Sequence, residues 1–350
     1  MTVRTFLPSG APDTASPPDG TAADGPSPSW GIRRAVRLAF PGPGEPAADP
    51  VHTARLRRYL TDLLHPYGLG LDAGALDEAA SPVGRAYGEM AEALVRAVVP
   101  EGESVDLLVL AHAVPDITPG RATTTRLSHV CPGTPMAFAV SDQGAASAFT
   151  ALRLVDAYAR SGGLRRALLL VVEQDSLPYD PGVPVVVPAA SRGVALLFGE
   201  PLPGERVATV SRVATHVLAS DSPAAVLTAE LADLDEPAGT GGLDGLGVTG
   251  GPGDGSEKGT VIAILGATVV AAAAHRWPAG LRFADAGQPA TGVWWDLAGE
   301  LAEPSGGPCR VVLADYDAGT HHLSLATVAL AGDGFGFDDG DGDGDGGVPG

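Results

Sequence analysis

One segment of the sequence, Met136–Leu152, has the pattern of a strand that turns sharply into a helix. The strand is a short apolar run, Ser141 and Asp142 favour a helix cap, and apolar residues then recur at helical spacing. Such a corner favours nucleophilic chemistry, because the positive end of the helix dipole lowers a thiol pKa and backbone N–H groups can hold an oxyanion. The corner residues are Gly144, Ala145 and Ala146, and none of them can attack a carbonyl group.

Two other side chains near this corner are candidate nucleophiles. Ser147 lies two residues into the expected helix, so its side chain points about 200° away from that of Ala145. This geometry favours helix packing over catalysis for the serine. Cys131 and His129 precede the strand, and burial is the expected role of that thiol.

The composition excludes several classes of function. The chain has 350 residues, 45% of them hydrophobic, and can bury a large core. A net charge of −20 and a pI near 4.6 argue against nucleic acid or an anionic membrane as the partner. No apolar run reaches the roughly 18 residues of a membrane helix, and two cysteines without a CxxC pair indicate neither a disulfide framework nor a metal site. We therefore expect a cytoplasmic protein that binds no metal.

Composition also divides the chain into two ordered halves between two polar tails. We expect a disordered tail over 1–29, an N-terminal half over 30–220, a C-terminal half over 221–330 and an acidic, Gly/Asp-rich disordered tail over 331–350. The Gly-rich stretch 236–259 is expected to be a loop of the second half. Helical patterns alternate with apolar strands in both halves, which predicts a layered α/β fold with a mostly parallel sheet.

The same patterns predict individual elements. Strands are expected over 30–40, 104–112, 136–141, 167–173, 193–198, 208–218, 260–265, 281–285, 309–315 and 322–330. Helices are expected over 51–65, 83–98, 145–161, 268–276 and 290–302. The similar order of elements in the two halves indicates an internal duplication.

Several segments together carry a family resemblance. They are Val105–Asp116, Pro135–Leu152, Arg165–Glu173, Gly287–Leu297 and Cys309–Leu330. In these segments the chain resembles the thiolase superfamily, and within it the initiating ketosynthases that are similar to acyl-carrier-protein synthase III. The resemblance covers about residues 30–330 and implies a thiolase-like αβαβα sandwich of two duplicated halves.

The resemblance also implies where catalytic residues would stand. Family members use a Cys at the elbow as acyl acceptor, with a His and an Asn that hold the thioester carbonyl. The Cys position falls on Ala145, and the Asn position falls on Gln288, which keeps an amide on a longer arm. The His position falls at the end of the strand over 260–265, near Gly266 or Ala267. A methyl group cannot form a thioester, so the catalytic triad is expected to be degenerate.

The substitutes that remain are Ser147 and His322. In the family, the turn before the last strand lies at the floor of the active site, which brings His322 near the expected pocket. A histidine that begins an exposed strand is the simpler interpretation of His322.

The resemblance further implies an assembly and a substrate class. The strand before the elbow, here Met136–Val140, forms the two-fold interface in the family, which implies a homodimer or a heterodimer with an active ketosynthase. No tightly bound cofactor is expected, and the substrates would be acyl-coenzyme A or the phosphopantetheine of an acyl carrier protein. An acidic carrier protein would need a basic docking patch, whereas a solvated face is the simpler role of the candidate arginines. These are Arg33, Arg34, Arg37, Arg55, Arg57 and Arg58.

Two functions are therefore expected from the sequence. The first is a ketosynthase-like, catalytically degenerate subunit of polyketide, fatty-acyl or other secondary-metabolite biosynthesis that pairs with an active ketosynthase. The alternative is an acyltransferase or condensing enzyme that acts on acyl thioesters without a Cys acyl-enzyme intermediate, because positioning alone can accelerate a reaction.

Overall fold

The computed structural model describes most of the chain between its two tails. The described residues are 30–42, 50–74, 76, 85–118, 122–161, 164–182, 185–203, 205, 207–218, 222–235, 260–272, 280–302 and 309–330. The predicted tails over 1–29 and 331–350 and the predicted loop over 236–259 lie outside this part of the chain.

The first sheet has five strands in the order β1-β5-β4-β2-β3. Strands β2, β3 and β4 are parallel, and β5 and β1 each add in antiparallel orientation. Every residue of β2 is buried, as expected for a central parallel strand that is covered on both faces. The strands are β1 (Gly31–Ala39), β2 (Leu107–Ala111), β3 (Met136–Val140), β4 (Arg166–Glu173) and β5 (Arg192–Gly199).

The second sheet repeats the first in sequence order and in strand direction. Its order is β6-β10-β9-β7-β8, so each strand has the number of its counterpart in the first sheet plus five. This agreement confirms the duplication that the sequence indicates. The sequence pattern places the boundary between the two halves at residue 220. β6, which ends at Val217, already belongs to the second sheet. The strands are β6 (Thr209–Val217), β7 (Thr260–Leu265), β8 (Gly280–Phe283), β9 (Cys309–Asp317) and β10 (His322–Leu330).

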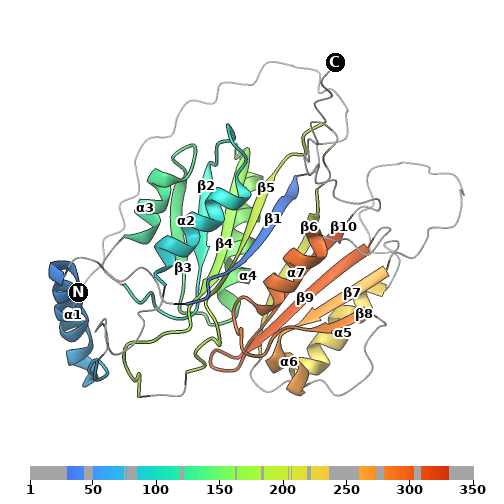
Figure 1. Cartoon of the computed structure of the whole chain (residues 1–350). Helices are drawn as coiled ribbons and strands as arrows, with labels where there is room; N and C mark the ends of the chain where they lie inside the picture. The colour runs from blue at the N-terminus through green and yellow to red at the C-terminus, as the bar shows by residue number, and fades with distance from the viewer. Residues whose placement is uncertain are drawn as a thin grey trace, which may run out of the picture.

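Helices form three layers around the two sheets (Figure 1). Helices α2 (Tyr87–Val98) and α3 (Thr123–Val130) cover the outer face of the first sheet, and α5 (Pro223–Asp235) and α6 (Ala267–Ala272) cover that of the second. Helices α4 (Ala146–Ser161) and α7 (Gly292–Ala302) lie between the sheets. The layer order is therefore αβαβα.

One further helix lies beside this sandwich. Helix α1 (Pro50–Leu64) is followed by a short 3-10 turn, η1 (His65–Tyr67), and lies at the edge of the molecule in Figure 1. It has its own small apolar cluster of Leu56, Leu60 and Leu76. None of the described helices is both long and apolar enough to cross a membrane.

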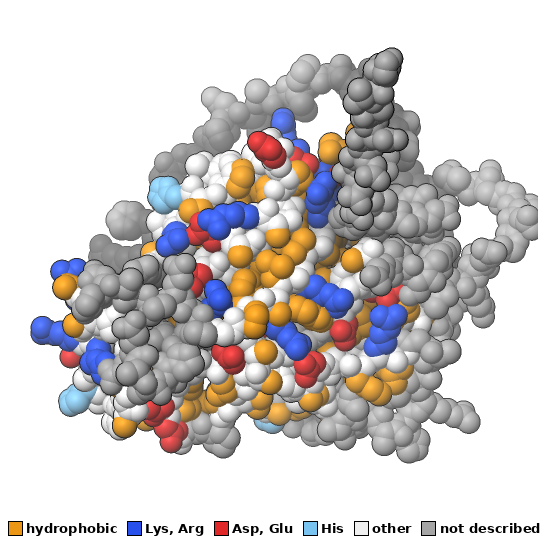
Figure 2. Space-filling view, in the orientation of Figure 1, with side chains coloured by type: hydrophobic (Ala, Val, Ile, Leu, Met, Phe, Trp, Pro, Cys, Tyr) orange, Lys and Arg blue, Asp and Glu red, His pale blue; other side chains and the backbone are white. Residues whose placement is uncertain are grey.

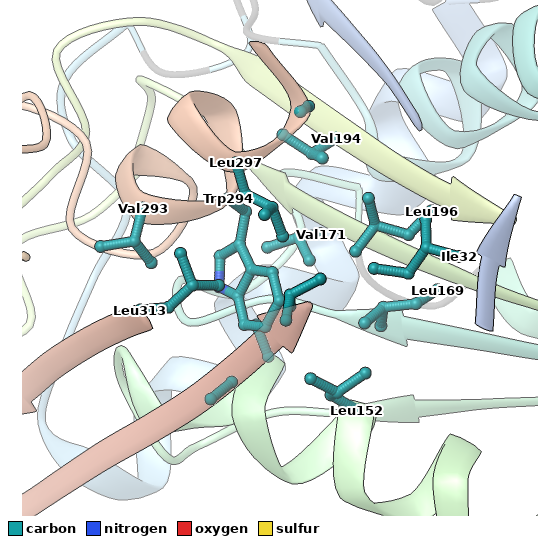
Figure 3. Packing of buried hydrophobic residues seen from close by; sticks show 14 of the residues in the cluster. Ile32, Leu152, Leu169, Val171, Val194, Leu196, Val293, Trp294, Leu297 and Leu313 are labelled. Carbon is teal, nitrogen blue, oxygen red and sulfur yellow. The ribbon is translucent and has the colours of Figure 1, made fainter. Parts of the chain in front are cut away.

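The largest apolar cluster joins both sheets through the central helices. Trp294 of α7 is fully buried and packs on Phe149 of α4, with ring centroids 4.9 Å apart. Figure 3 shows the Trp294 ring among Val171 of the first sheet and Leu313 of the second. Trp294 thus packs in the core between the two sheets, and this packing helps to hold the two halves together.

Candidate functional site

The elbow between β3 and α4 has a sharply turned backbone. Asp142 and Gly144 adopt left-handed φ angles of 61° and 50°, a region that glycine enters at little cost and that other residues rarely adopt. Ala145 follows them at the start of α4 and is 8% exposed. Its methyl group offers no reactive atom, so the only group that Ala145 can offer at this position is its backbone N–H.

That N–H is occupied by a carboxylate from the other half of the chain. Ala145 N–H donates to Oδ2 of Asp317 at 3.2 Å. Asp317 ends β9, and its Oδ1 accepts hydrogen bonds from the N–H (2.7 Å) and hydroxyl (2.9 Å) of Thr320 in the turn to β10. A β-carbon at Gly144 would collide with the same carboxylate. The second half therefore contributes an anion to the N-terminus of α4.

A second carboxylate fills the space beside Gly266, which follows β7. A β-carbon at Gly266 would collide with the side chain of Asp315, two residues before Asp317 on β9. Oδ1 of Asp315 accepts from the Tyr316 N–H at 2.9 Å and from the Thr268 hydroxyl at 3.3 Å. Burial raises the pKa of Asp315 to about 7, against hydrogen bonds that favour its charged form. We refer to Asp315 and Asp317 as the acidic pair.

A third buried carboxylate holds the loop that begins α7. Glu173, at the end of β4, is fully buried and accepts from the N–H groups of Ala290 (2.9 Å) and Thr291 (3.0 Å) and from the Thr291 hydroxyl (2.7 Å). Burial raises its pKa, and these hydrogen bonds act in the opposite direction. Glu173 thus ties the first sheet to the helix that carries Trp294.

Gln288 belongs to this loop and is 2% exposed. Its Nε2 donates to the carbonyl of Ala190 at 3.1 Å. Its Oε1 lies 3.2 Å from the Thr291 hydroxyl oxygen and shares the single proton of that hydroxyl with Glu173, which is nearer at 2.7 Å. Both ends of the amide are therefore used inside the protein. This arrangement gives Gln288 a structural role in joining the α7 loop to the segment before β5.

Comparisons with known proteins agree with the architecture. No protein-family model matches the chain, and no curated protein matches its sequence. AbyA1, described as a tetronic acid condensing enzyme, is 17% identical, with a TM-score of 0.53 over 86% of this chain and 99% of AbyA1. ChlB3, described as an acyltransferase, is 16% identical, with a TM-score of 0.52 over 88% of this chain and all of ChlB3. OleA of Xanthomonas campestris, bound to cerulenin, is 12% identical, with a TM-score of 0.54 over 86% of this chain and 99% of OleA.

The chain has a thiolase-like fold. Its architecture matches that of these solved structures, as the resemblance in the sequence implies. Within this fold, Ala145, Gly266 and Gln288 come from the three segments that the sequence assigns to the active site. Ala145 and Gly266 each lie against one member of the acidic pair, and Gln288 bonds to Thr291, the partner of Glu173.

The two predicted substitutes, Ser147 and His322, have different surroundings. Ser147 is 1% exposed, and its hydroxyl has no hydrogen-bond partner among the described residues. No general base therefore contacts it. His322 is half-buried and stands opposite Asp317 in the β9–β10 pairing, so both side chains leave the same face of the sheet.

The sequence did not reveal the three carboxylates of this candidate site. An acidic residue at the end of an apolar strand usually meets solvent, and the sequence has no signal that separates Glu173, Asp315 and Asp317 from that case. Although these groups are acidic, the described residues include no cluster of three or more His, Cys, Asp or Glu side chains that could hold a metal ion.

The arginines that the sequence suggests as a patch do not share one environment. Arg33 is buried, and its guanidinium pairs with Glu103 and Glu205, each at 2.7 Å, so it cannot belong to a docking surface. Arg37 lies over Trp295 with Arg192, 5.3 and 5.0 Å from the ring centroid. Figure 2 shows basic side chains interspersed with hydrophobic and acidic ones on the face in view.

Proposed function

We propose that this chain is a ketosynthase-like subunit of acyl-chain biosynthesis that has no acyl-enzyme chemistry of its own and pairs with an active ketosynthase. The observation that carries this proposal is the state of the three catalytic positions. Ala145 has no nucleophile, Gly266 has a carboxylate in its side-chain space, and the amide of Gln288 is engaged at both ends. All three positions differ from the family pattern, although the fold is kept. Selection for a non-catalytic role explains the three differences together.

The open edge of the first sheet supports assembly with another protein. β3 is the terminal strand of its sheet, so one row of its backbone N–H and C=O groups has no strand partner among the described residues. Met136 is 47% exposed on this strand. Phe138 packs on Tyr158 of α4, itself 37% exposed, with ring centroids 6.0 Å apart. An edge strand beside exposed apolar side chains is a template for pairing with another sheet.

The ligands of such an assembly would be acyl thioesters. In this proposal the partner supplies the reactive cysteine, and acyl-coenzyme A or the phosphopantetheine of an acyl carrier protein delivers the acyl group. This chain would complete the dimer and shape the space that the acyl chain enters. The condensing and acyl-transferring enzymes that share the fold support this substrate class.

A second candidate function is direct acyl transfer without a covalent intermediate. Asp315 favours it, because a buried carboxyl with a pKa of about 7 can accept a proton at neutral pH. Asp315 would take the proton of the acyl acceptor while the acceptor attacks the thioester carbonyl and the thiolate leaves. The carboxylate lies beside Gly266, where the family places its histidine.

Two measurements test these functions. The chain is incubated with acetyl-coenzyme A and examined by intact-protein mass spectrometry, and free coenzyme A is followed in the same sample. We expect no adduct and no turnover for the isolated chain, and an active heteromer when it is co-expressed with an intact ketosynthase from the same genome. A stable acyl adduct or a fully active homodimer would contradict the first function. Turnover without an adduct would support the second.

A further inference from the structure

We propose that Asp317 determines what the N-terminus of α4 can bind, and that its carboxylate closes this position to an acyl oxyanion independently of the missing nucleophile. The inference rests on the proposed function and deepens it. It states that restoring a thiol at position 145 is not sufficient to restore acylation, because the donors that an acyl group would need are already used.

The hydrogen-bond donors at the start of α4 are each occupied. Ala145 N–H donates to Asp317 at 3.2 Å. Ala146 N–H donates to the carbonyl of Gln143 at 3.0 Å, and Ser147 N–H donates to that of Gly144 at 3.2 Å. A helix N-terminus normally leaves its first N–H groups free for an anion. Here an anion from the same chain already accepts from the N–H at the elbow.

Hydrogen bonds from Thr320 hold the Asp317 carboxylate in this position. Both contacts of Asp317 with Thr320 use Oδ1, which leaves Oδ2 directed at the elbow. Gly144 supplies the complementary surface, because any side chain there would displace the carboxylate. Residues 145 and 317 are 172 positions apart in sequence, so this contact depends on the docking of the two halves.

The charge of Asp317 has a chemical consequence. The positive end of the helix dipole stabilises a carboxylate at this position. The same negative charge would raise the pKa of a thiol at position 145 and oppose an oxyanion there, since like charges disfavour each other. Asp317 therefore acts against both steps of thioester formation: generation of the thiolate and stabilisation of the tetrahedral intermediate.

The test uses Ala145→Cys in four backgrounds: Asp317 unchanged, Asp317→Asn, Asp317→Ala and, as a matched control, Asp62→Asn. Asp62 is an exposed carboxylate on α1. Alkylation by iodoacetamide is followed against pH, and peptide mass spectrometry assigns each adduct to position 145, because Cys131 and Cys309 also carry thiols. The pH profile separates the thiol pKa from simple access to the thiol.

With Asp317→Asn we expect alkylation of position 145 at pH 7 to rise about tenfold relative to Ala145→Cys alone, through a thiol pKa about one unit lower. With Asp317→Ala we expect an acetyl adduct from acetyl-coenzyme A, which Ala145→Cys alone and the Asp62→Asn control do not form. Equal thiol pKa values with and without Asp317, or an acetyl adduct in Ala145→Cys alone, would overturn the inference.

Loss of Asp317 also removes a contact between the halves. A variant that keeps Asp317 therefore separates the orientation of its carboxylate from an effect on folding. Thr320→Val keeps the backbone N–H but loses the hydroxyl that orients the carboxylate, and we expect it to give an intermediate alkylation rate in the Ala145→Cys background. A rate in Thr320→Val equal to that with Asp317 intact would contradict the positioning argument. Because wild-type protein has no thiol at position 145, these results are independent of whether the isolated chain has turnover or pairs with a ketosynthase.

Discussion

The carboxylate of Asp315 occupies the space that a side chain at position 266 would need. Gly266 directly follows β7, and Asp315 lies on β9, which pairs with β7 in parallel orientation. The N–H of Gly266 donates to the carbonyl of Ala314, the residue before Asp315, at 2.8 Å. The glycine and the acid are therefore mutually dependent. Together with Asp317 at the elbow, this relationship places one carboxylate of the second half against each of Gly266 and Ala145.

We expect Gly266→Ala to destabilise the protein by about 2–3 kcal/mol, because the new methyl group must displace buried, hydrogen-bonded Asp315. Asp315→Ala introduced together with Gly266→Ala should recover part of this loss. Urea unfolding measures both effects. Gly70→Ala is the matched control, since a β-carbon at Gly70 has no atom within 4 Å. Equal stability of Gly266→Ala and Gly70→Ala would contradict the mutual dependence.

The titration of Asp315 predicts a pH dependence of stability. Burial raises its folded-state pKa from 3.8 to about 7, so between these values the folded state binds a proton that the unfolded state releases. Folding stability from this group is therefore complete below pH 4 and declines as the pH rises toward 7. The decline has an upper limit of about 4 kcal/mol, at 1.36 kcal/mol for each pKa unit.

Unfolding by urea at a series of pH values checks this prediction. Asp315→Asn cannot ionise, so we expect its free energy of unfolding to decrease less between pH 4 and pH 7 than that of the wild type. Parallel pH profiles of the two proteins would show that Asp315 titrates at its ordinary value.

The hydrogen bonds of Glu173 predict the effect of a substitution on stability. Its two oxygens accept three hydrogen bonds from Ala290 and Thr291, and Glu173→Gln would place an amide N–H₂ group against donors. We expect a loss of about 2–3 kcal/mol, because buried donors are left without acceptors. Glu200→Gln makes the same chemical change at an exposed position and should stay within about 0.5 kcal/mol of the wild type. Chemical denaturation of both variants decides the matter, and a similar small loss in each would assign Glu173 no special role.

The positions of the strands along the chain were predictable because the core strands contain almost no polar residues. Runs such as Leu107–Ala111 and Val261–Leu265 are apolar at every position, which indicates strands buried on both faces. Helix α3 was not predicted, because it begins with three threonines and buries only Leu127, which leaves no apolar periodicity to recognise. The predicted helix over 83–98 begins later, at Tyr87, and Ala86 provides no side-chain cap there.

The three positions of the expected site could be named from the sequence, but the acidic side chains that lie against two of them could not. Ala145 stands out because a strand-to-helix corner has a defined chemical use. Asp315 and Asp317 have no such local context. The contact of Asp315 with Gly266 arises from the pairing of β7 with β9, and the contact of Asp317 with Ala145 arises only when the two halves dock. Arg33 illustrates the reverse case: it looks like a surface charge in the sequence and is buried between two glutamates in the fold.

Assembly through β3 gives the last prediction. Ala139 is exposed on this terminal strand, and a charge there would be buried without a partner if a second sheet pairs with β3. We expect Ala139→Glu to convert the assembled protein to monomers, as measured by sedimentation or light scattering, while the circular dichroism spectrum is retained. Val217→Glu is the matched control, because Val217 is 71% exposed on the terminal strand of the other sheet and should tolerate the charge.

The same pair of variants distinguishes the two kinds of partner. If the wild-type chain alone sediments as a dimer and Ala139→Glu as a monomer, β3 pairs with a second copy. If the wild-type chain is monomeric alone but co-purifies with a ketosynthase, and only Ala139→Glu abolishes this co-purification, β3 pairs with that enzyme. An assembly that Val217→Glu disrupts and Ala139→Glu leaves intact would place the interface on the second sheet, and the proposed role of β3 would be wrong.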